Sequence, residues 1–488
     1  MRLILLVFLF LLCTANTAQN LSVALNGTAT QNGLVGMSVV AICNGQVTDV
    51  VHTGQSDVQR AIAVSDSTRY RIASISKLVT AIGLMRLWEQ GAFALDDDVS
   101  ATLGFTLRNP AFPNTPITYR MLLTHRSSLQ DGTGYGNFLS ATYATAPPPP
   151  ITQLVTTGGN WYTSDLWRTE APGTYFTYSN LNFGVVGTLI EALSGQRFDQ
   201  YMRQQVLLPL GIGGSYNVQD LNDLDDLAVL YRNSLPQADD LGGVMPTPPD
   251  LSQYVNGTNG LFFAPQGGLR ASALELARVA LLLAGEGTWN GTTLLQPATV
   301  NAMLANEWSW NGSNGDNYYG LFRSWGLGVH RITAQSGGDL VFPGTAMFGH
   351  AGEAYGLISD LYIDPATGFG LIFITNGYTS GNAYTFGANS AFYGVEEDVY
   401  AALGTYAVSA CATLGLTAPA QQDDLLVQER LLLWNGTGLL ELQAFDLMGK
   451  LLSTGRLAPG ATWTPPTEVP QLVHVRSVDG RSRTIRLY

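Results

Sequence analysis

The stretch Arg71-Ile-Ala-Ser-Ile-Ser-Lys77 decides the interpretation of this chain, because of its last residue. The 488 residues include only two lysines, Lys77 and Lys450, among 24 basic side chains, so the other 22 are arginines. Arginine stays protonated in proteins, whereas a lysine that is withdrawn from water can lose its proton and act as a base. The sequence therefore predicts a chemical role for Lys77.

The spacing within this stretch supports that role. Residues three apart share one face of a helix, so Ser74 and Lys77 are expected to lie within reach of each other, with Ser74 as an activated nucleophile. Residues 78–91 have the apolar spacing of a buried helix that stops at Gly91. Ser74 would then lie near the first turn, where free backbone N–H groups can stabilise an oxyanion.

Length and charge restrict the class of protein. A chain of this length with 46% hydrophobic residues can bury a large core, and we expect one large domain and one smaller one. The net charge of −13 leaves no basic stripe, which argues against nucleic acid and anionic membrane surfaces as partners. No apolar run after the first residues is long enough to span a bilayer.

The first 18 residues have a charged start, a short apolar core and a small-residue cleavage site after Ala18. This pattern is typical of a signal peptide and predicts export. We expect a secreted or cell-surface protein, with the periplasm as the alternative location.

The remaining cysteines and the histidines leave little room for a metal. After signal cleavage only Cys43 and Cys411 are present, which permits one disulfide or two buried free thiols. The five histidines have no metal-ligand spacing, and we expect neither a metal nor an organic cofactor.

Apolar and turn patterns predict an α+β fold. Asn44-Gly45 separates the first two expected strands and is a strong hairpin signal. A helix is expected through residues 395–411, and the long middle of the chain is mostly helical in pattern. The expected architecture is an antiparallel sheet flanked by helices, with a mostly helical insertion and the active site at their junction. The expected strands cover residues 37–43, 48–52, 356–364 and 368–375.

Five motifs in order resemble the serine hydrolases related to class C β-lactamases, DD-peptidases and penicillin-binding proteins. The resemblance covers roughly residues 30–410 and implies a β-lactamase/transpeptidase-like fold. The motifs are Arg71–Leu78, Leu122–Leu129, Pro172–Asn180, Gly267–Arg270 and Phe348–Gly352.

The resemblance implies roles for individual residues. Ser74 would be the acylated nucleophile, and Lys77 its hydrogen-bonded partner. Tyr178 would be a general base or proton shuttle whose pKa is lowered by nearby cations. Asn180 would position Lys77 and the substrate carbonyl. Whether Lys77 or Tyr178 takes the first proton stays open.

The third motif implies an oxyanion hole and a change of substrate. The backbone N–H groups of Ser74 and Glu353 would bind the oxyanion. β-Lactamases of this group carry Lys-Thr-Gly where this chain has His350-Ala-Gly352, followed by the acidic Glu353, which argues against carboxylate recognition. Ser128 stands where relatives often have a glycine, which we interpret as structural.

The resemblance therefore favours hydrolysis of a small ester or a D-amino-acid peptide over efficient β-lactam turnover. Such an enzyme would form an acyl-enzyme on Ser74 and would act on a small-molecule or peptide substrate, with peptidoglycan as one candidate. The alternative is a catalytically inactive relative that binds peptidoglycan or peptides.

The sequence pattern of the C-terminal region predicts a separate module. We expect the hydrolase domain over residues 19–415, a linker over 416–424, and a small β-sandwich over 425–488 because short alternating strands replace the earlier pattern. The runs Phe445–Lys450 and Arg481–Arg486 resemble the C-terminal sorting domain of type IX secretion in Bacteroidetes. That resemblance implies the type IX machinery as a partner; a carbohydrate-binding β-sandwich is the alternative.

Overall fold

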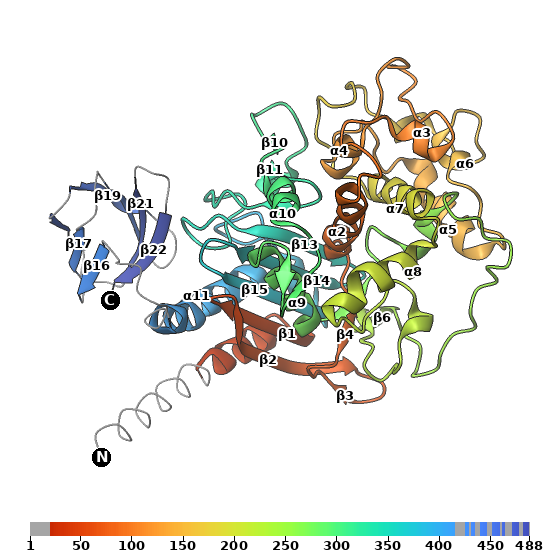
Figure 1. Ribbon diagram of the computed structural model, residues 1–488. Coiled ribbons are helices and arrows are strands. Elements are labelled where there is room, and N and C mark those ends of the chain that lie inside the picture. The colour runs from red at the N-terminus through yellow and green to blue at the C-terminus, as the bar shows by residue number, and fades with distance from the viewer. Residues whose placement is uncertain are drawn as a thin grey trace.

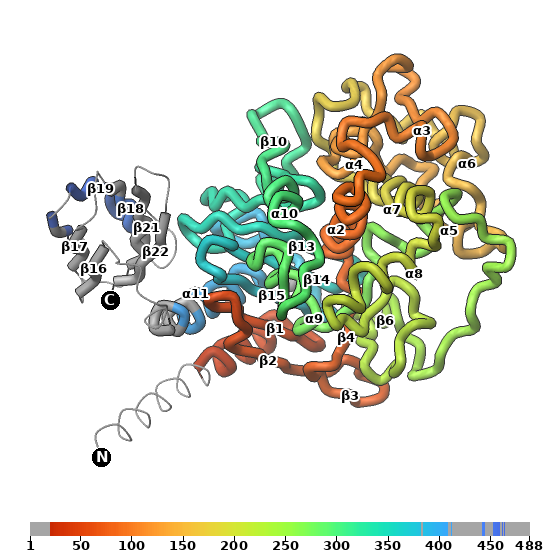
Figure 2. The backbone as a smooth tube through the Cα atoms, in the orientation of Figure 1, coloured from red at the N-terminus to blue at the C-terminus, as the bar shows by residue number. Residues whose placement is uncertain are grey.

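The computed structural model describes residues 20–414 together with most strands of the C-terminal region. In that region it describes residues 425–428, 431–434, 440–446, 451–458, 461–463, 471–477 and 482–487. Figure 1 shows a central sheet with a group of helices on one side of it. The chain leaves the sheet after its first strands, forms the helical insertion and returns for the last strands (Figure 2).

The sheet is built from both ends of the hydrolase region, as predicted. Strand β1 (Leu34–Cys43) is an interior strand and pairs antiparallel with both β2 (Gln46–Asp57) and β15 (Phe369–Tyr378). β14 (Leu357–Asp364) and β13 (Phe348–Ala354) continue the sheet on the far side of β15. Strands separated by more than 300 residues are therefore neighbours, which closes the domain around the insertion.

Shorter strands extend the sheet at its edges. One edge continues through β12, β11 and β10, and the other ends at β3. All these pairings are antiparallel except that of β5 with β15, which is parallel. Their bounds are β3 Ile62–Ala63, β5 Leu230–Arg232, β6 Leu235–Ala238, β10 Trp308–Ser309, β11 Ser324–Trp325 and β12 His330–Arg331.

The first hairpin forms where its turn residues predict it. Cys43 pairs with Gln46, so Asn44 and Gly45 are the two-residue loop. Both have positive φ angles, 51° and 71°, which the turn between tightly twisted strands requires and which asparagine and glycine tolerate.

Alternate side chains of the sheet supply two separate cores. Val40 faces the core that contains α9 (Ala273–Ala284), whereas Val39 faces the core that contains α11 (Gly394–Leu414) and the helix over residues 20–31. Because successive strand residues point to opposite faces, one strand can be apolar throughout and still serve both cores.

The insertion surrounds one helix, α2 (Ile75–Glu89). Twelve of its 15 residues are buried, so it is apolar on nearly all sides, as expected for a helix at the centre of a domain. It ends just before Gly91, whose φ is 75°, and packs against α7 (Asn180–Ser194). The predicted helix and its stop are confirmed.

The other helices of the domain are short. Their bounds are α3 Val99–Leu103, α4 Tyr119–Leu123, α5 Thr133–Ala144, α6 Thr152–Val155, α8 Phe198–Met202 and α10 Pro297–Leu304. Two small ribbons complete it: β4 (Arg69–Arg71) with β7 (Arg270–Ser272), and β8 (Thr288–Trp289) with β9 (Thr292–Thr293).

The C-terminal strands form two antiparallel sheets, in agreement with the predicted β-sandwich. One has the order β16-β17-β20 and the other β19-β18-β21-β22. The signal segment 1–18, the linker 416–424, and residues 447–450 and 481 of the sorting-domain resemblance lie outside the described residues. The strands are β16 Leu425–Gln428, β17 Leu431–Trp434, β18 Leu440–Asp446, β19 Leu451–Leu457, β20 Thr462–Trp463, β21 Gln471–Ser477 and β22 Ser482–Leu487.

No helix in the part of the chain that the structure describes is long and apolar enough to cross a membrane. Of the two states left open for the cysteines, the structure has the disulfide. It joins Cys43 at the end of β1 to Cys411 in α11, across a sequence separation of 368 residues.

This disulfide leads to a prediction about stability. We expect Cys411→Ser to lower the free energy of unfolding by about 2–4 kcal/mol, because the cross-link restricts the unfolded chain over a very long loop. Urea denaturation measures the change, and the reduced wild-type protein is the control. A reductant that leaves the urea midpoint of the wild-type protein unchanged would contradict the prediction.

Candidate active site

Ser74 lies at the start of α2, where three structural features meet. The ribbon of β4 and β7 delivers the chain to Ala73, a non-glycine residue in the left-handed region with φ 49°. Ser74 then forms the N-cap of α2, and its carbonyl oxygen accepts the Lys77 N–H at 2.9 Å. The first turn is thus wound tightly enough to bring the Ser74 and Lys77 side chains together.

The Lys77 amine has three oxygen neighbours. Nζ lies 3.0 Å from Ser74 Oγ, 2.8 Å from Asn180 Oδ1 and 2.8 Å from the Gln266 carbonyl oxygen. The side chain is fully buried, and no carboxylate of the described residues forms an ion pair with it. The predicted contact between Ser74 and Lys77 and that between Asn180 and Lys77 are both present.

Burial changes the protonation of Lys77. Removal from water lowers its pKa to about 7, although the negative charge of Asp131 opposes this shift. At neutral pH a large fraction of the molecules therefore carries Lys77 as a neutral amine. The expectation that this lysine can lose its proton agrees with its surroundings.

Tyr178 covers the amine from one side. Lys77 Nζ lies 4.8 Å from the centre of the Tyr178 ring, which itself packs against His125 at 4.5 Å and Phe322 at 5.0 Å between ring centres. The Tyr178 hydroxyl is buried beside the Ser74 side chain. Burial raises the pKa of Tyr178, which is the opposite of the predicted direction.

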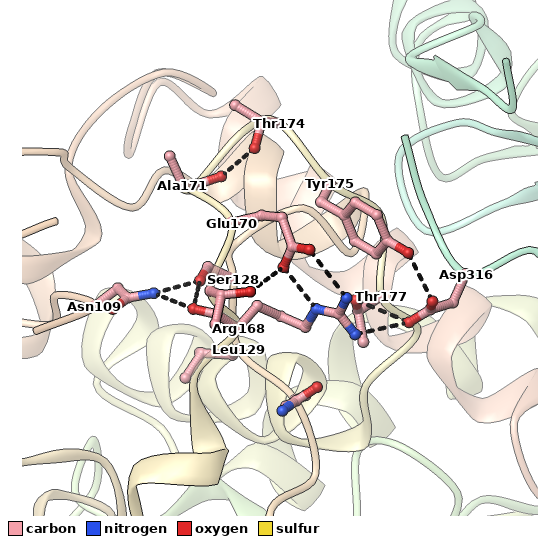
Figure 3. Close-up of polar contacts among 12 residues, drawn as sticks. Asn109, Ser128, Leu129, Arg168, Glu170, Ala171, Thr174, Tyr175, Thr177 and Asp316 are labelled. Carbon is pink, nitrogen blue, oxygen red and sulfur yellow. Dashed lines mark hydrogen bonds and ion pairs between the residues drawn. The ribbon is translucent and has the colours of Figure 1, made fainter. Parts of the chain in front are cut away.

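A polar cluster holds the segment that leads into Tyr178 (Figure 3). Arg168 bridges Glu170 and Asp316, and Asp316 also accepts hydrogen bonds from the hydroxyl groups of Tyr175 at 2.8 Å and Thr177 at 3.4 Å. Backbone bonds on both sides complete the support, because Thr177 N–H donates to the His125 carbonyl and Asp316 N–H to the Phe176 carbonyl. The position of Tyr178 is thereby set by segments far apart in sequence.

Ser128 belongs to the same support. Its φ is 71°, which explains why a glycine would suit this turn and agrees with a structural role. Asn109 Nδ2 stabilises the turn by donating hydrogen bonds to Ser128 Oγ at 2.6 Å and to the Arg168 carbonyl oxygen at 2.8 Å (Figure 3).

Strand β13 lies directly against the backbone of Ser74. A side-chain carbon added at Gly352 would come within 2.7 Å of the Ile72 carbonyl oxygen and 3.2 Å of Ser74 N. Only glycine permits this approach, so the structural contribution of Gly352 is the room it leaves.

The backbone of Glu353 points toward the open edge of β13. Ala354 and Leu357 flank the two-residue turn between β13 and β14, and pairs in such a ladder alternate between exchanging hydrogen bonds and not doing so. The Glu353 N–H therefore points away from β14. Since β12 pairs only with Phe348 and Gly349, no strand of the described residues lies beside Glu353 at this edge.

His350 is buried beside Tyr178 and is held in one tautomer. Its Nδ1 lies 2.5 Å from the Ala351 carbonyl oxygen, which can only accept, so Nδ1 carries the proton. Burial and the nearby Lys77 keep the pKa of His350 well below its usual value. Nε2 is left as a buried acceptor without a partner among the described residues.

Glu353 brings a negative charge to the rim of the site. Its side chain is exposed, and its Oε2 accepts a hydrogen bond from the Tyr393 hydroxyl at 2.8 Å. Among the described residues it forms no ion pair. The third motif thus combines a neutral histidine with a carboxylate.

Two residues of the site were not predicted. His125 Nδ1 accepts from the Ser179 N–H at 3.1 Å and from Asn182 Nδ2 at 3.2 Å, which orients the ring that supports Tyr178. Asp131 accepts from the Asn180 side chain at 2.7 Å. Both lie within or just after the Leu122–Leu129 motif. Their partners, Ser179 and Asn180, are about 50 residues further along the chain, so the motif alone does not predict these contacts.

No group of three or more His, Cys, Asp or Glu side chains in the described ranges could hold a metal ion. The chemistry that the site offers is that of a buried amine between a hydroxyl and two carbonyl-type acceptors.

The chain is similar in sequence to known proteins. The chain is 28% identical over 230 residues to the D-alanyl-D-alanine-carboxypeptidase/endopeptidase AmpH of Escherichia coli K12, an alignment that covers 46% of this chain and 57% of that protein. It is 22% identical to penicillin-binding protein 4 of Amycolatopsis lactamdurans, over 73% of this chain and 84% of that one. The chain spans little more than half the length of AmpH.

Solved structures agree with the architecture. The D-amino acid amidase from Ochrobactrum anthropi SV3, complexed with L-phenylalanine amide, superposes with a TM-score of 0.59 at 20% identity and covers 81% of this chain and 99% of its own. This similarity shows the fold. The family model described as Beta-lactamase matches residues 20–389, and the chain therefore belongs to the β-lactamase family.

Proposed function

We propose that this protein is a serine hydrolase that cleaves an ester or amide through an acyl-enzyme on Ser74. The observation that carries the proposal is the environment of the Lys77 amine, whose three oxygen neighbours include the Ser74 hydroxyl at 3.0 Å. The carboxypeptidase/endopeptidase AmpH, which is similar in sequence, and the D-amino acid amidase, which is similar in fold, support the reaction class.

Lys77 is the proposed general base. A neutral amine has two N–H donors and one lone pair, and its other two neighbours, Asn180 Oδ1 and the Gln266 carbonyl, can only accept. Both N–H groups are then used by these acceptors, and the lone pair faces Ser74 Oγ, the one neighbour that can donate. Proton transfer from Ser74 to Lys77 produces the nucleophile as the hydroxyl attacks.

Tyr178 is the proposed proton donor to the leaving group. Its raised pKa keeps the phenol neutral and able to donate, and its hydroxyl is buried beside Ser74. Tyr178 would donate its proton to the departing nitrogen or oxygen, and the proton that Lys77 took from Ser74 would then restore the phenol. The protons of the acylation step are thereby balanced. The Ser74 and Glu353 N–H groups would bind the oxyanion.

The charges at the substrate end favour neutral or amine-bearing substrates over carboxylates. His350 is neutral at physiological pH and Glu353 is negative. A small ester, or the amide of a D-amino acid with a free amino group, fits these charges better than a β-lactam does, because β-lactams carry a carboxylate. Peptidoglycan-derived peptides are also candidate substrates, provided that their carboxylate binds away from Glu353.

Export is part of the same proposal. The signal-peptide pattern of residues 1–18 supports delivery out of the cytoplasm, and the runs at 445–450 and 481–486 support type IX sorting to the cell surface.

Acylation of Ser74 can be tested directly. We expect a fluorophosphonate probe to label the wild-type protein, with no adduct on Ser74→Ala, because the buried amine activates only this hydroxyl. Intact-protein mass spectrometry measures the adduct, and Ser140→Ala, which removes an exposed serine on the surface of α5, should label like the wild type.

A matched set of substrates separates the enzyme from the binding module. A short-chain nitrophenyl ester, a D-alanyl peptide and nitrocefin should each be tested for Ser74-dependent turnover. A protein that binds the peptide, takes up no probe and turns over none of the three would be the inactive relative.

The pKa of Lys77 predicts the pH dependence of acylation. The base is active when neutral, so the acylation rate should rise with pH through about 7 and level off above it. Lys77→Arg keeps the charge but cannot supply a base, and we expect it to lower the rate about 10²–10⁴-fold at unchanged fold. Stopped-flow measurement from pH 5 to 9 tests this; a flat profile, or a fully active Lys77→Arg variant, would refute it.

The charge of Glu353 predicts substrate preference. Glu353→Gln should raise kcat/KM for nitrocefin, which carries a carboxylate, by about 2–5-fold, because a partly solvated like charge costs up to about 1 kcal/mol. The neutral nitrophenyl ester should change less than twofold. Tyr393→Phe removes the hydrogen bond but keeps the charge, so a gain with that variant as well would argue against electrostatics.

A further inference from the structure

Asp131 makes four hydrogen bonds to three consecutive residues at the start of α7. Its Oδ1 accepts from Ser179 Oγ and from the Leu181 N–H, both at 2.9 Å. Its Oδ2 accepts from Asn180 Nδ2 at 2.7 Å and from the Asn180 N–H at 3.2 Å. The carboxylate lies 49 residues earlier in the chain and accepts hydrogen bonds from both the backbone N–H and the side-chain amide of Asn180.

The bond to the Asn180 side chain fixes which way its amide faces. An asparagine amide can present either its oxygen or its NH2 group to a neighbour, and the two orientations have nearly the same shape. A carboxylate can only accept, so the NH2 group must face Asp131. The amide oxygen is then turned toward Lys77 Nζ, at 2.8 Å.

The orientation of Asn180 in turn determines what Lys77 can do. If the amide were reversed, two donors would face each other across this gap, and the amine would lose one of its two obligatory acceptors. One N–H of the neutral amine could then turn toward Ser74 Oγ and compete with the lone pair. The carboxylate therefore acts on Ser74 through two intervening side chains.

We propose that Asp131 is a positioning residue that locks the Asn180 amide and so keeps the Lys77 lone pair directed at Ser74. This inference rests on the proposed function for its effect on rate. The direct effect on Lys77 is independent of turnover.

Asp131 has a second, simpler effect that the test must separate. Ser179, the N-cap of α7, does not cap the helix with its own side chain, and Asp131 caps the first N–H groups instead. Loss of this cap alone would lower stability by about 1 kcal/mol. It would leave the Asn180 amide and the Lys77 amine as they are.

The two lysines of the chain make the test feasible. Lysine labelled with ¹³C at Cε gives signals from Lys77 and Lys450 only, and Lys450→Arg removes the second. In this background, Asp131→Asn keeps the size and the helix-capping oxygen but loses the obligatory acceptor and the charge. Asp131→Glu keeps both the charge and the acceptor.

Asp165→Asn is the matched control. Asp165 is an exposed carboxylate that accepts from the Thr133 N–H at the start of α5, at 2.9 Å, and it contacts neither Asn180 nor Lys77. Its variant loses the same charge from a helix start outside the site.

Three results are expected for Asp131→Asn. The Lys77 signal should titrate at lower pH than in the wild type, because the charge of Asp131 raises the pKa of Lys77. The plateau acylation rate should fall about 10–100-fold with KM changed less than threefold, since misdirection of a reacting group by about 1 Å has this cost. Asp131→Glu should recover at least part of the rate, and Asp165→Asn should match the wild type in both readouts.

The outcomes separate the two proposals. A wild-type protein without any turnover would sink the proposed function, while a Lys77 titration that shifts in Asp131→Asn and returns in Asp131→Glu would still show that the Asp131 carboxylate acts on Lys77. A wild-type plateau rate in Asp131→Asn would overturn the positioning role, whether or not the Lys77 titration moves. A lowered melting temperature alone would reduce Asp131 to a helix cap.

Discussion

The rest of the site depends on the burial of one amine. An ammonium group withdrawn from water is strongly destabilised unless a negative charge pairs with it, and no such pair is present for Lys77 among the described residues. The fold instead surrounds the amine with oxygens of a hydroxyl, an amide and a peptide carbonyl. These groups suit a neutral amine as well as a charged one, so burial lowers the pKa without leaving either form unsatisfied.

The surrounding architecture follows from this requirement. α2 is buried on nearly all sides, and the core that covers it combines apolar side chains of the sheet with those of the helical insertion, which keeps Lys77 out of water. The remaining groups come from other segments: Asn180 from the start of α7, Gln266 from the loop before β7, and Tyr178 from a segment fixed by the Arg168 and Asp316 cluster. The site is therefore formed by segments distant in sequence, and the packing of the domain fixes their relative positions.

Local features of the sequence predicted local features of the fold. The Asn44-Gly45 turn and the stop of α2 at Gly91 depend on neighbouring residues alone, and both are present as expected. The direction of the Tyr178 pKa was wrong because its burial comes from His125 and Phe322, which no local pattern connects to it. The Asp131 contact and the choice of the Cys43–Cys411 disulfide over free thiols likewise need three-dimensional positions, since the partners lie 49 and 368 residues apart.

The histidine of the third motif is consistent with a site that holds a single titrating amine. A second ammonium where His350 lies would repel a proton on Lys77 and would need an anionic substrate group to balance it. The imidazole is instead fixed as a neutral acceptor by the Ala351 carbonyl, and the charge of Lys77 itself helps keep the proton off His350. His125, on the other side of Tyr178, is kept neutral by burial and by the same amine, since both lower its pKa. In the proposed reaction, the one positive charge that forms as Ser74 loses its proton would therefore be concentrated on Lys77, which lies 3.0 Å from Ser74 Oγ and beside the Tyr178 ring.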